Sequence, residues 1–236
     1  MNKVNFSIYR HIIYYKITFE NFREFIPRAT GINLSEFNDI YVNKFTYIRF
    51  LNISEYKINI LPKELFNKQL RIFNCYWNNI KVIPSEIGNC KELQIFDCSV
   101  NQITFIPPDI CKLTNLKNFN CSNNQITFIP SDICKLTNLK NFNCNDNKIL
   151  TIPTEIEDCK NLQEFHCSWN KITVMPLIIN LQKIYCNNNQ ITVIPSDIGK
   201  LKNLQKFYCS NNKITVIPSD IGDCENLREF DCIIIK

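Results

Sequence analysis

The sequence predicts an α/β repeat fold, an open solenoid with short parallel strands on its concave face and 3-10 or short helical turns on its convex face. The first observation is a proline that recurs eight times, in most cases every 23 residues. The second is a leucine (Ile48 in the first copy) 14 residues before each proline and an apolar residue 11 residues before it. The third is a cysteine nine residues before, and an asparagine six residues before, all but the first proline. These prolines are Pro62, Pro84, Pro107, Pro130, Pro153, Pro176, Pro195 and Pro218.

The strand of each unit is predicted to be the segment that ends at the cysteine, such as LKNFNC at residues 116–121. Phe119 and Cys121 are two residues apart and therefore share one face of a strand, whereas Asn120 and Ser122 take the other face. Such a short strand is not stable alone. Stacked at about 4.8 Å, successive copies would form one parallel sheet.

The strand cysteines are predicted to form one structural column of small buried hydrophobic side chains. A row of redox-active or metal-binding thiols is the alternative, but the sequence contains no C-x-x-C pair. A catalytic pair at His166 and Cys167 is rejected because adjacent strand residues point to opposite faces. The column consists of Cys75, Cys98, Cys121, Cys144, Cys167, Cys186, Cys209 and Cys232.

The recurring asparagines are predicted to be structural. A side-chain amide carries two donors and an acceptor, so stacked asparagines can bond the turns of their own and the neighbouring copy. Leaving such a column buried and unpaired would be costly. The members of this asparagine ladder are Asn78, Asn101, Asn124, Asn147, Asn170, Asn189 and Asn212.

The segment after each proline is predicted to form a single helical or 3-10 turn. Proline fixes φ, and the Ser-Asp pairs at 196–197 and 219–220 are expected to supply a capping serine and a first-turn acid. The copy at 162–180 is four residues shorter, because only LIIN separates Pro176 from Leu181. We therefore expect its convex turn to be missing and the array to bend there.

The unit L-x-x-F-x-C-x-x-N-x-I-x-x-I-P-x-x-I-x-x-L resembles the leucine-rich repeat family, in particular its intracellular class. The resemblance covers residues 47–236, with eight repeats and a partial ninth. Phenylalanine and cysteine depart from the family's usual leucines. The resemblance implies a right-handed horseshoe whose concave sheet binds another protein.

Both ends of the chain depart from the repeat. Residues 1–46 are predicted to be an N-terminal cap or helical flanking region, since Leu34, Phe37 and Tyr41 have helical spacing. An adaptor domain is the alternative. At the other end, three isoleucines at 233–235 follow the last cysteine. This edge suggests either end-to-end self-association or a truncated array.

Composition places the protein inside the cell, in the cytoplasm, or in the host cytoplasm if the protein is viral. Arg10, His11 and Lys16 interrupt any apolar core of a signal peptide, and no stretch approaches the ~18 apolar residues of a membrane span. The net charge of +5 is mild. With no nucleotide-binding or zinc-protease motif, we expect no enzyme activity and no cofactor.

The candidate partner-binding residues lie on the outward face of the strands. His166, Tyr185 and Tyr208 fall side by side in one column, next to Lys183 and Lys206. Exposed aromatic side chains beside charge are typical of protein interfaces. Trp169 is a further candidate at the rim of the sheet. Tyr76 and Trp77 are candidates in a second, more apolar patch that also contains Ile72 and Ile95.

Three functions stay open. The first is a scaffold that binds another protein through the concave sheet, and the second is a structural or self-associating protein. The third and least favoured is a nucleic-acid-associated protein, a hypothesis that rests on the mild positive charge. Ordinary cross-strand packing would also account for each candidate residue taken singly.

Overall fold

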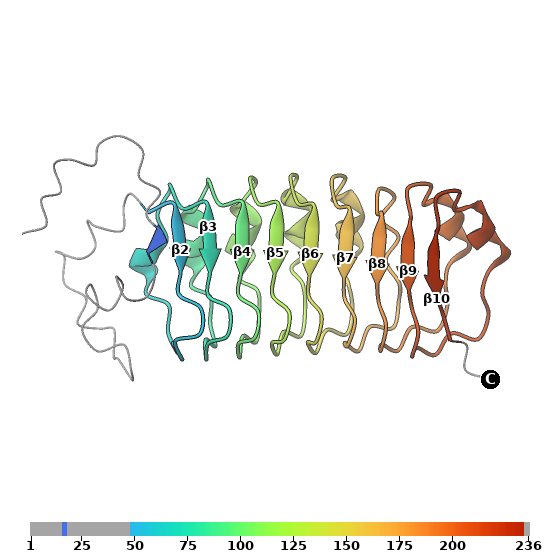
Figure 1. Ribbon diagram of the computed structural model, residues 1–236, viewed down its shortest axis with the longest axis horizontal. Coiled ribbons are helices and arrows are strands. Elements are labelled where there is room, and N and C mark those ends of the chain that lie inside the picture. Colours follow the sequence, from blue (N-terminus) through green and yellow to red (C-terminus); the bar gives the residue numbers. More distant parts are fainter. Residues whose placement is uncertain (1–15, 18–47, 234–236) are drawn as a thin grey trace, which may run out of the picture.

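The computed structural model describes residues 16–17 and 48–233, which form one solenoid (Figure 1). Ten strands make a single parallel sheet in the order of the sequence, so the predicted repeat solenoid is confirmed. Each strand pairs in register with the next, and equivalent residues therefore form columns. The strands are β1 (Lys16–Ile17), β2 (Phe50–Asn52), β3 (Ile72–Asn74), β4 (Ile95–Asp97), β5 (Asn118–Asn120), β6 (Asn141–Asn143), β7 (Glu164–His166), β8 (Lys183–Tyr185), β9 (Lys206–Tyr208) and β10 (Glu229–Asp231).

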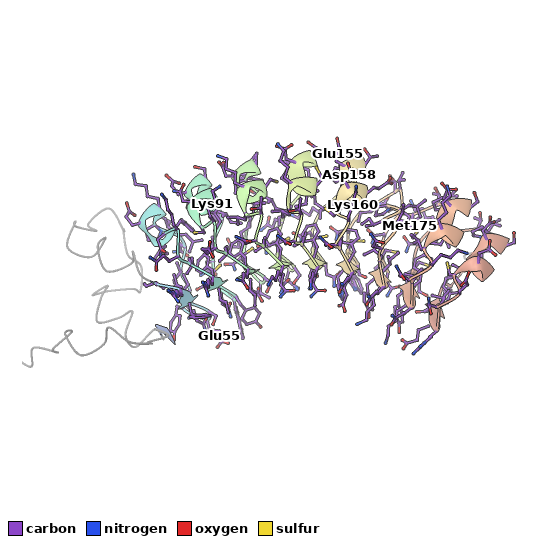
Figure 2. All side chains as sticks on the ribbon, turned by 90° about the horizontal axis from the view of Figure 1, so that it is seen from above. Glu55, Lys91, Glu155, Asp158, Lys160 and Met175 are labelled. Atoms are coloured by element: carbon purple, nitrogen blue, oxygen red, sulfur yellow. The ribbon has the colours of Figure 1, made fainter. Side chains whose placement is uncertain are left out.

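Short 3-10 turns occupy the convex side of the sheet (Figure 2). They are η3 (Lys63–Leu65), η4 (Ser85–Asn89), η5 (Pro108–Lys112), η6 (Ser131–Lys135), η7 (Thr154–Asp158), η8 (Ser196–Lys200) and η9 (Ser219–Asp223). Each begins directly after a recurring proline, including η5, which follows Pro107 and begins at Pro108. Within the described ranges, no helix has the length and apolarity that crossing a bilayer requires.

From β2 to β9 the middle residue of each strand forms the core beneath the sheet. From Phe73 to Phe142, successive phenylalanine rings are parallel within 7° and their centroids lie 5.4–5.6 Å apart. Stacked aromatic pairs of this kind contribute about 0.5–1.5 kcal/mol each beyond the area they bury. Ile184 interrupts the column at β8.

The strand cysteines lie one residue beyond each strand and line the same core. Cys75 and seven successors stack along the sheet, and only the last, Cys232, is partly exposed. All thirteen cysteines of the chain are free thiols. Burial raises the pKa of Cys167 to about 12, so this thiol stays protonated and unreactive at neutral pH.

Each recurring asparagine bonds the backbone of two repeats. The Asn124 amide Nδ2 donates to the carbonyl oxygens of Cys121, in its own repeat, and of Cys98, in the repeat before, both at 3.1 Å. Its Oδ1 accepts from the Ile103 backbone N–H at 2.9 Å. The other six asparagines repeat this arrangement, with donor distances of 2.8–3.1 Å to the same two kinds of carbonyl.

The residue before each asparagine adopts a left-handed backbone conformation. These residues have φ between 51° and 57°, although none of them is glycine. Left-handed backbone costs about 1–2 kcal/mol for ordinary L-residues, and a β-branched residue such as Val100 (φ 54°) is an outlier there. The hydrogen bonds of the following asparagine hold the turn in this shape. The residues are Trp77, Val100, Asn123, Asp146, Trp169, Asn188 and Asn211.

The prediction that serine caps the convex turns is wrong. The N-cap residues of η8 and η9 are Pro195 and Pro218, and neither turn has a side-chain cap hydrogen bond. The proline carbonyl itself accepts the first 3-10 bond, from Ile198 N–H at 3.0 Å in η8. The serine is therefore the first residue inside the turn, too late to cap it. The expected first-turn acids, Asp197 and Asp220, are present.

The short repeat lacks a convex turn, as its missing residues predict. Between β7 and β8, a stretch that is described throughout, the chain passes from Met175 to Leu181 without a 3-10 turn. Met175 and Ile178 are buried and fill the core in place of the usual isoleucines. Figure 2 shows the row of convex turns interrupted near Met175 and displaced beyond it, so the array bends here.

Most of the predicted N-terminal cap, residues 1–46, lies outside the described residues, as does its expected helical segment around Leu34. The exception is β1, whose residues Lys16 and Ile17 pair with Phe50 and Leu51 of β2. The sheet therefore begins one strand before the first recognisable repeat. The repeat pattern could not predict this strand, because its sequence lacks the leucine, cysteine and asparagine positions.

Replacing Asn124 by alanine should lower the free energy of unfolding by about 3 kcal/mol, because it leaves several buried backbone groups without partners. Urea denaturation measures this effect. Asn138→Ala is the matched control: Asn138 is exposed and makes one hydrogen bond, to the Thr114 carbonyl, so its loss should cost about 0.5 kcal/mol. Equal effects of the two substitutions would contradict the ladder's structural role.

Replacing Val100 by asparagine should raise the free energy of unfolding by about 0.5–1 kcal/mol, because asparagine tolerates the left-handed conformation far better than valine. The reverse change at the equivalent position of the next repeat, Asn123→Val, should lower it by a similar amount. Thermal and urea unfolding of both variants test the pair. If Val100→Asn is destabilising, backbone strain at this position is not significant.

Candidate functional site

The concave face consists of the first and third side chains of every strand. In most strands the middle residue is buried and its two neighbours are half-buried, as the alternation of a strand requires. Because the strands are in register, the concave face carries two straight columns of side chains. The chemistry of this surface therefore depends on which residues the sequence places in these two columns.

Three aromatic side chains of the C-terminal half form one continuous stack. The rings of His166 and Tyr185 lie 4.3 Å apart at 11°, and those of Tyr185 and Tyr208 lie 5.1 Å apart at 6°. We call these three residues the aromatic stack. Each ring is supported by its neighbour on the adjacent strand, so the stack presents a preformed apolar wall.

Ion pairs run along the neighbouring column. Lys183 Nζ lies 2.7 Å from Glu164 Oε1, and Lys206 Nζ lies 2.7 Å from Glu229 Oε1. The same carboxylates contact the aromatic stack. Glu164 Oε2 lies 3.6 Å from His166 Nε2, and Glu229 accepts a hydrogen bond from the Tyr208 hydroxyl. One acid at each end thus fixes both a lysine and an aromatic ring.

Burial determines the charge state of the histidine. It lowers the pKa of His166, and the nearby Glu164 carboxylate only partly opposes this effect. The imidazole is therefore neutral at pH 7. Hydrogen bonding to Glu164 raises the pKa of Lys183, so this lysine keeps its charge. The site combines neutral rings with fully charged lysines.

Trp169 is not part of the aromatic stack. It lies in the turn after β7, where its side chain is 62% exposed, and none of the ring contacts among the described residues joins it to His166. The backbone at this position is left-handed (φ 57°), so Trp169 does not continue the alternation of the strand columns.

The second predicted patch lies near the N-terminal end of the array. The rings of Tyr76 and Trp77 meet edge to face, with centroids 6.1 Å apart. Trp77 is 58% exposed and lines a hollow of about 300 Å³ together with Glu55, Lys57, Asn78 and Asn79. The first repeat has Tyr56 in place of the ladder asparagine, and both Glu55 and Lys57 are left-handed there. The turn of the first repeat therefore differs from all later turns, and two of its residues, Glu55 and Lys57, line the hollow.

The serine column after the cysteines is not available to a partner, although the sequence predicts that Ser122 lies on the strand face opposite the buried Cys121. Ser122 is only 6% exposed, and its Oγ donates to Asn120 Oδ1 at 2.9 Å. The side chains of the concave columns cover these serines where the chain leaves the strand. The buried members are Ser99, Ser122, Ser168 and Ser210.

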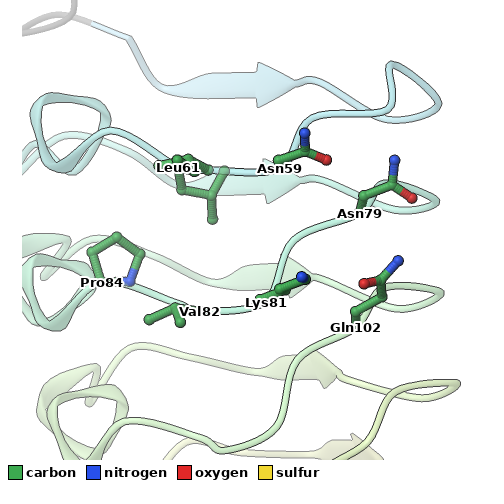
Figure 3. Close-up of a pocket in the computed structure, with 8 residues that line it drawn as sticks. Asn59, Leu61, Asn79, Lys81, Val82, Pro84 and Gln102 are labelled. Atoms are coloured by element: carbon green, nitrogen blue, oxygen red, sulfur yellow. The ribbon is translucent and has the colours of Figure 1, made fainter. Parts of the chain in front are cut away.

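The sequence reasoning missed a column of exposed apolar side chains two residues before the prolines. It follows from the I-x-x-I-P spacing, since both isoleucines turn inward and the residues between them must turn outward. Among the first repeats, Val82 and Ile60 border a groove of about 740 Å³. Figure 3 shows Asn79 and Gln102 at one end of this groove and Pro84 toward the other. The exposed members are Ile60, Val82, Phe128, Val174, Val193 and Val216.

The described residues show no candidate metal site. No group of three or more histidine, cysteine or acidic side chains within 16–17 and 48–233 could hold a metal ion. His166 and Cys167 lie on opposite faces: the imidazole is on the concave surface and the thiol is fully buried. What the concave arrangement offers is an aromatic wall beside fixed charges, which is suited to recognition.

Solved structures with this fold include a leucine-rich repeat protein of Leptospira interrogans, with 25% identity over 82% of the chain and a TM-score of 0.70. A plant peptide hormone receptor in complex with RGF2 is 28% identical over 80% of the chain, with a TM-score of 0.64. The functional domain of InlJ from Listeria monocytogenes, described as including a cysteine ladder, is 23% identical over 82% of the chain with a TM-score of 0.72. The chain spans 57%, 37% and 41% of these proteins, respectively.

No curated protein sequence matches the chain. Two family models do. A leucine-rich repeat region matches residues 32–187, and a pair of leucine-rich repeats matches residues 179–214. The first of these covers well over half of the sequence, in agreement with the parallel sheet and its convex 3-10 turns. The chain therefore belongs to the leucine-rich repeat family.

Proposed function

We propose that this protein is a non-enzymatic scaffold that binds another protein through the concave face of its sheet. The observation that carries the proposal is the aromatic stack of His166, Tyr185 and Tyr208, held at both ends by charged side chains. Aromatic side chains with little remaining freedom are the usual anchors of protein interfaces, because they bury a large area at a small entropic cost.

A partner could contact both patches at once. From β3, next to Trp77, to β9, which carries Tyr208, there are six strand spacings, or about 29 Å. An interface of standard size, about 800 Å² on each partner, covers such a distance. The C-terminal patch would contribute stacked rings and charges, and the N-terminal patch would contribute Tyr76 and Trp77.

The comparison with the plant receptor supports a protein or peptide ligand. That receptor was solved in complex with RGF2 and shares 28% identity with this chain. This similarity supports the binding of a protein or peptide in general. The partner depends on the side chains of the concave columns, since one fold serves many partners.

We infer that the protein works inside the cell. Cys121 and Cys144 occupy equivalent positions on adjacent strands, which are about 4.8 Å apart, within the Cα separation that a disulfide tolerates. A reducing compartment keeps such neighbours as thiols, and all thirteen cysteines are free.

Replacing His166, Tyr185 and Tyr208 together by alanine should weaken partner binding at least about 30-fold, the effect of losing one or more interface anchors. The partner would be captured from the native host with the intact chain and identified, and its affinity for both proteins would be measured by calorimetry. Loss of binding should occur without loss of fold in circular dichroism.

The matched control replaces Thr173, Thr192 and Thr215 by alanine. These threonines are exposed on the segments that lead to the recurring prolines, in the same three repeats, and their removal should leave the affinity unchanged. If the partner binds the stack variant as tightly as the intact chain, the concave C-terminal surface is not the binding site.

Self-association through β10 is a second candidate function. No strand pairs with the outer edge of β10 among the described residues. Phe230 is 37% exposed and Ile233 is 61% exposed. Open strand edges with apolar side chains are templates for pairing with another chain.

If this edge pairs two chains, light scattering should give a mass that rises toward that of a dimer with concentration, and Ile233→Lys should keep the protein monomeric. Val216→Lys, at an exposed valine away from the edge, is the control and should not alter the mass. A monomer at every concentration would exclude this function.

A further inference from the structure

Two lysines lie side by side on the concave face. Lys183 of β8 and Lys206 of β9 are register partners. From β2 to β10 they are the single pair of like charges in register in the first concave column. The rest of that column consists of apolar residues, asparagines and one acid at each end of the lysine pair. Like charges directly opposite each other destabilise a sheet.

The order of charges makes this pair unusual. Along β7 to β10 the column is Glu164, Lys183, Lys206, Glu229. An alternating order would place an acid next to each lysine on both sides and remove the repulsion. Here each lysine bonds the acid on its outer side, so the space between the two lysines has no negative group in this column. A local conflict of this kind in an otherwise regular structure is typical of a functional position.

Both lysines have hydrogen-bonding capacity left. An ammonium group has three donors, and the short contact to the neighbouring glutamate uses one of them. Their side chains are 29% and 34% exposed, compared with 60–67% for Lys112, Lys135 and Lys200 in the convex turns. Partial removal from water strengthens the interaction of a charge with a ligand.

The aromatic stack supplies a third group at this place. Tyr185 follows Lys183 by two residues and shares its face of β8. Its ring is fixed between His166 and Tyr208. The Tyr208 hydroxyl donates to Glu229, whereas within the described residues the Tyr185 hydroxyl has no hydrogen-bond partner. Adjacent strands β8 and β9 therefore carry two ammonium groups and one phenol hydroxyl that still have donors to spare.

We propose that this place on β8 and β9 recognises an acidic residue of the bound partner, whose carboxylate lies between Lys183 and Lys206 and next to Tyr185. The carboxylate accepts hydrogen bonds from both ammonium groups and removes the repulsion between them. The aromatic stack receives the apolar side chain that neighbours the acid. The partner is thus an acidic peptide segment with an adjacent apolar residue, a conclusion that rests on the proposed function of the concave face.

The test is selection of random linear peptides, displayed on phage, against the full-length protein and against its Lys183→Gln, Lys206→Gln variant. Peptides that bind the intact chain should be enriched in aspartate or glutamate at one position, and the double variant should not select for acid. A selected peptide with its acid changed to the amide should bind the intact chain about 10-fold more weakly, and the double variant should bind both forms equally.

The matched control is Lys112→Gln, Lys135→Gln, which removes the same charge from the convex turns and should retain the acid preference. Selected peptides without acid enrichment, or with equal enrichment on the double variant, would overturn the inference. The variant in which His166, Tyr185 and Tyr208 are replaced by alanine distinguishes this outcome from failure of the proposed function. If it binds the selected peptides as well as the intact chain does, the concave site itself is wrong.

Discussion

The structure depends on the hydrogen bonds that one asparagine per repeat makes to two successive turns. Asn124 donates to Cys121 and Cys98 and accepts from Ile103, so a single amide satisfies backbone groups in two repeats. These bonds hold the preceding residue in a left-handed conformation that most side chains avoid. They also set where each chain segment leaves the strand, and with it the register of the whole sheet.

The core follows from that register. Because the asparagine turns recur from one repeat to the next, phenylalanine rings stack at 5.4–5.6 Å and cysteines fill the narrow space behind them. Each repeat contacts its neighbours alone, so stability is the sum of repeats and of the interfaces between them. The repeat that ends near Met175 shows how much variation this allows: four residues and the convex turn are missing, yet β7 and β8 remain in register.

The concave face benefits from the same rigidity. A side chain on a strand of this sheet is placed by its neighbours before any partner arrives, which reduces the entropy lost on binding. The aromatic stack and its flanking ion pairs illustrate this, since Glu164 fixes both Lys183 and the neighbouring His166. The two lysines of like charge that are register partners on β8 and β9 are then the position most easily explained by a ligand.

The sequence by itself determined the repeat, the inward columns, the missing convex turn and the residues of the concave columns, because these follow from periodicity and strand alternation. The tertiary structure alone decided that Ser122 is covered and that Pro195 replaces Ser196 as the cap. The physical reason is that spacing assigns a residue to a face, whereas burial and ring contacts depend on neighbours from other repeats.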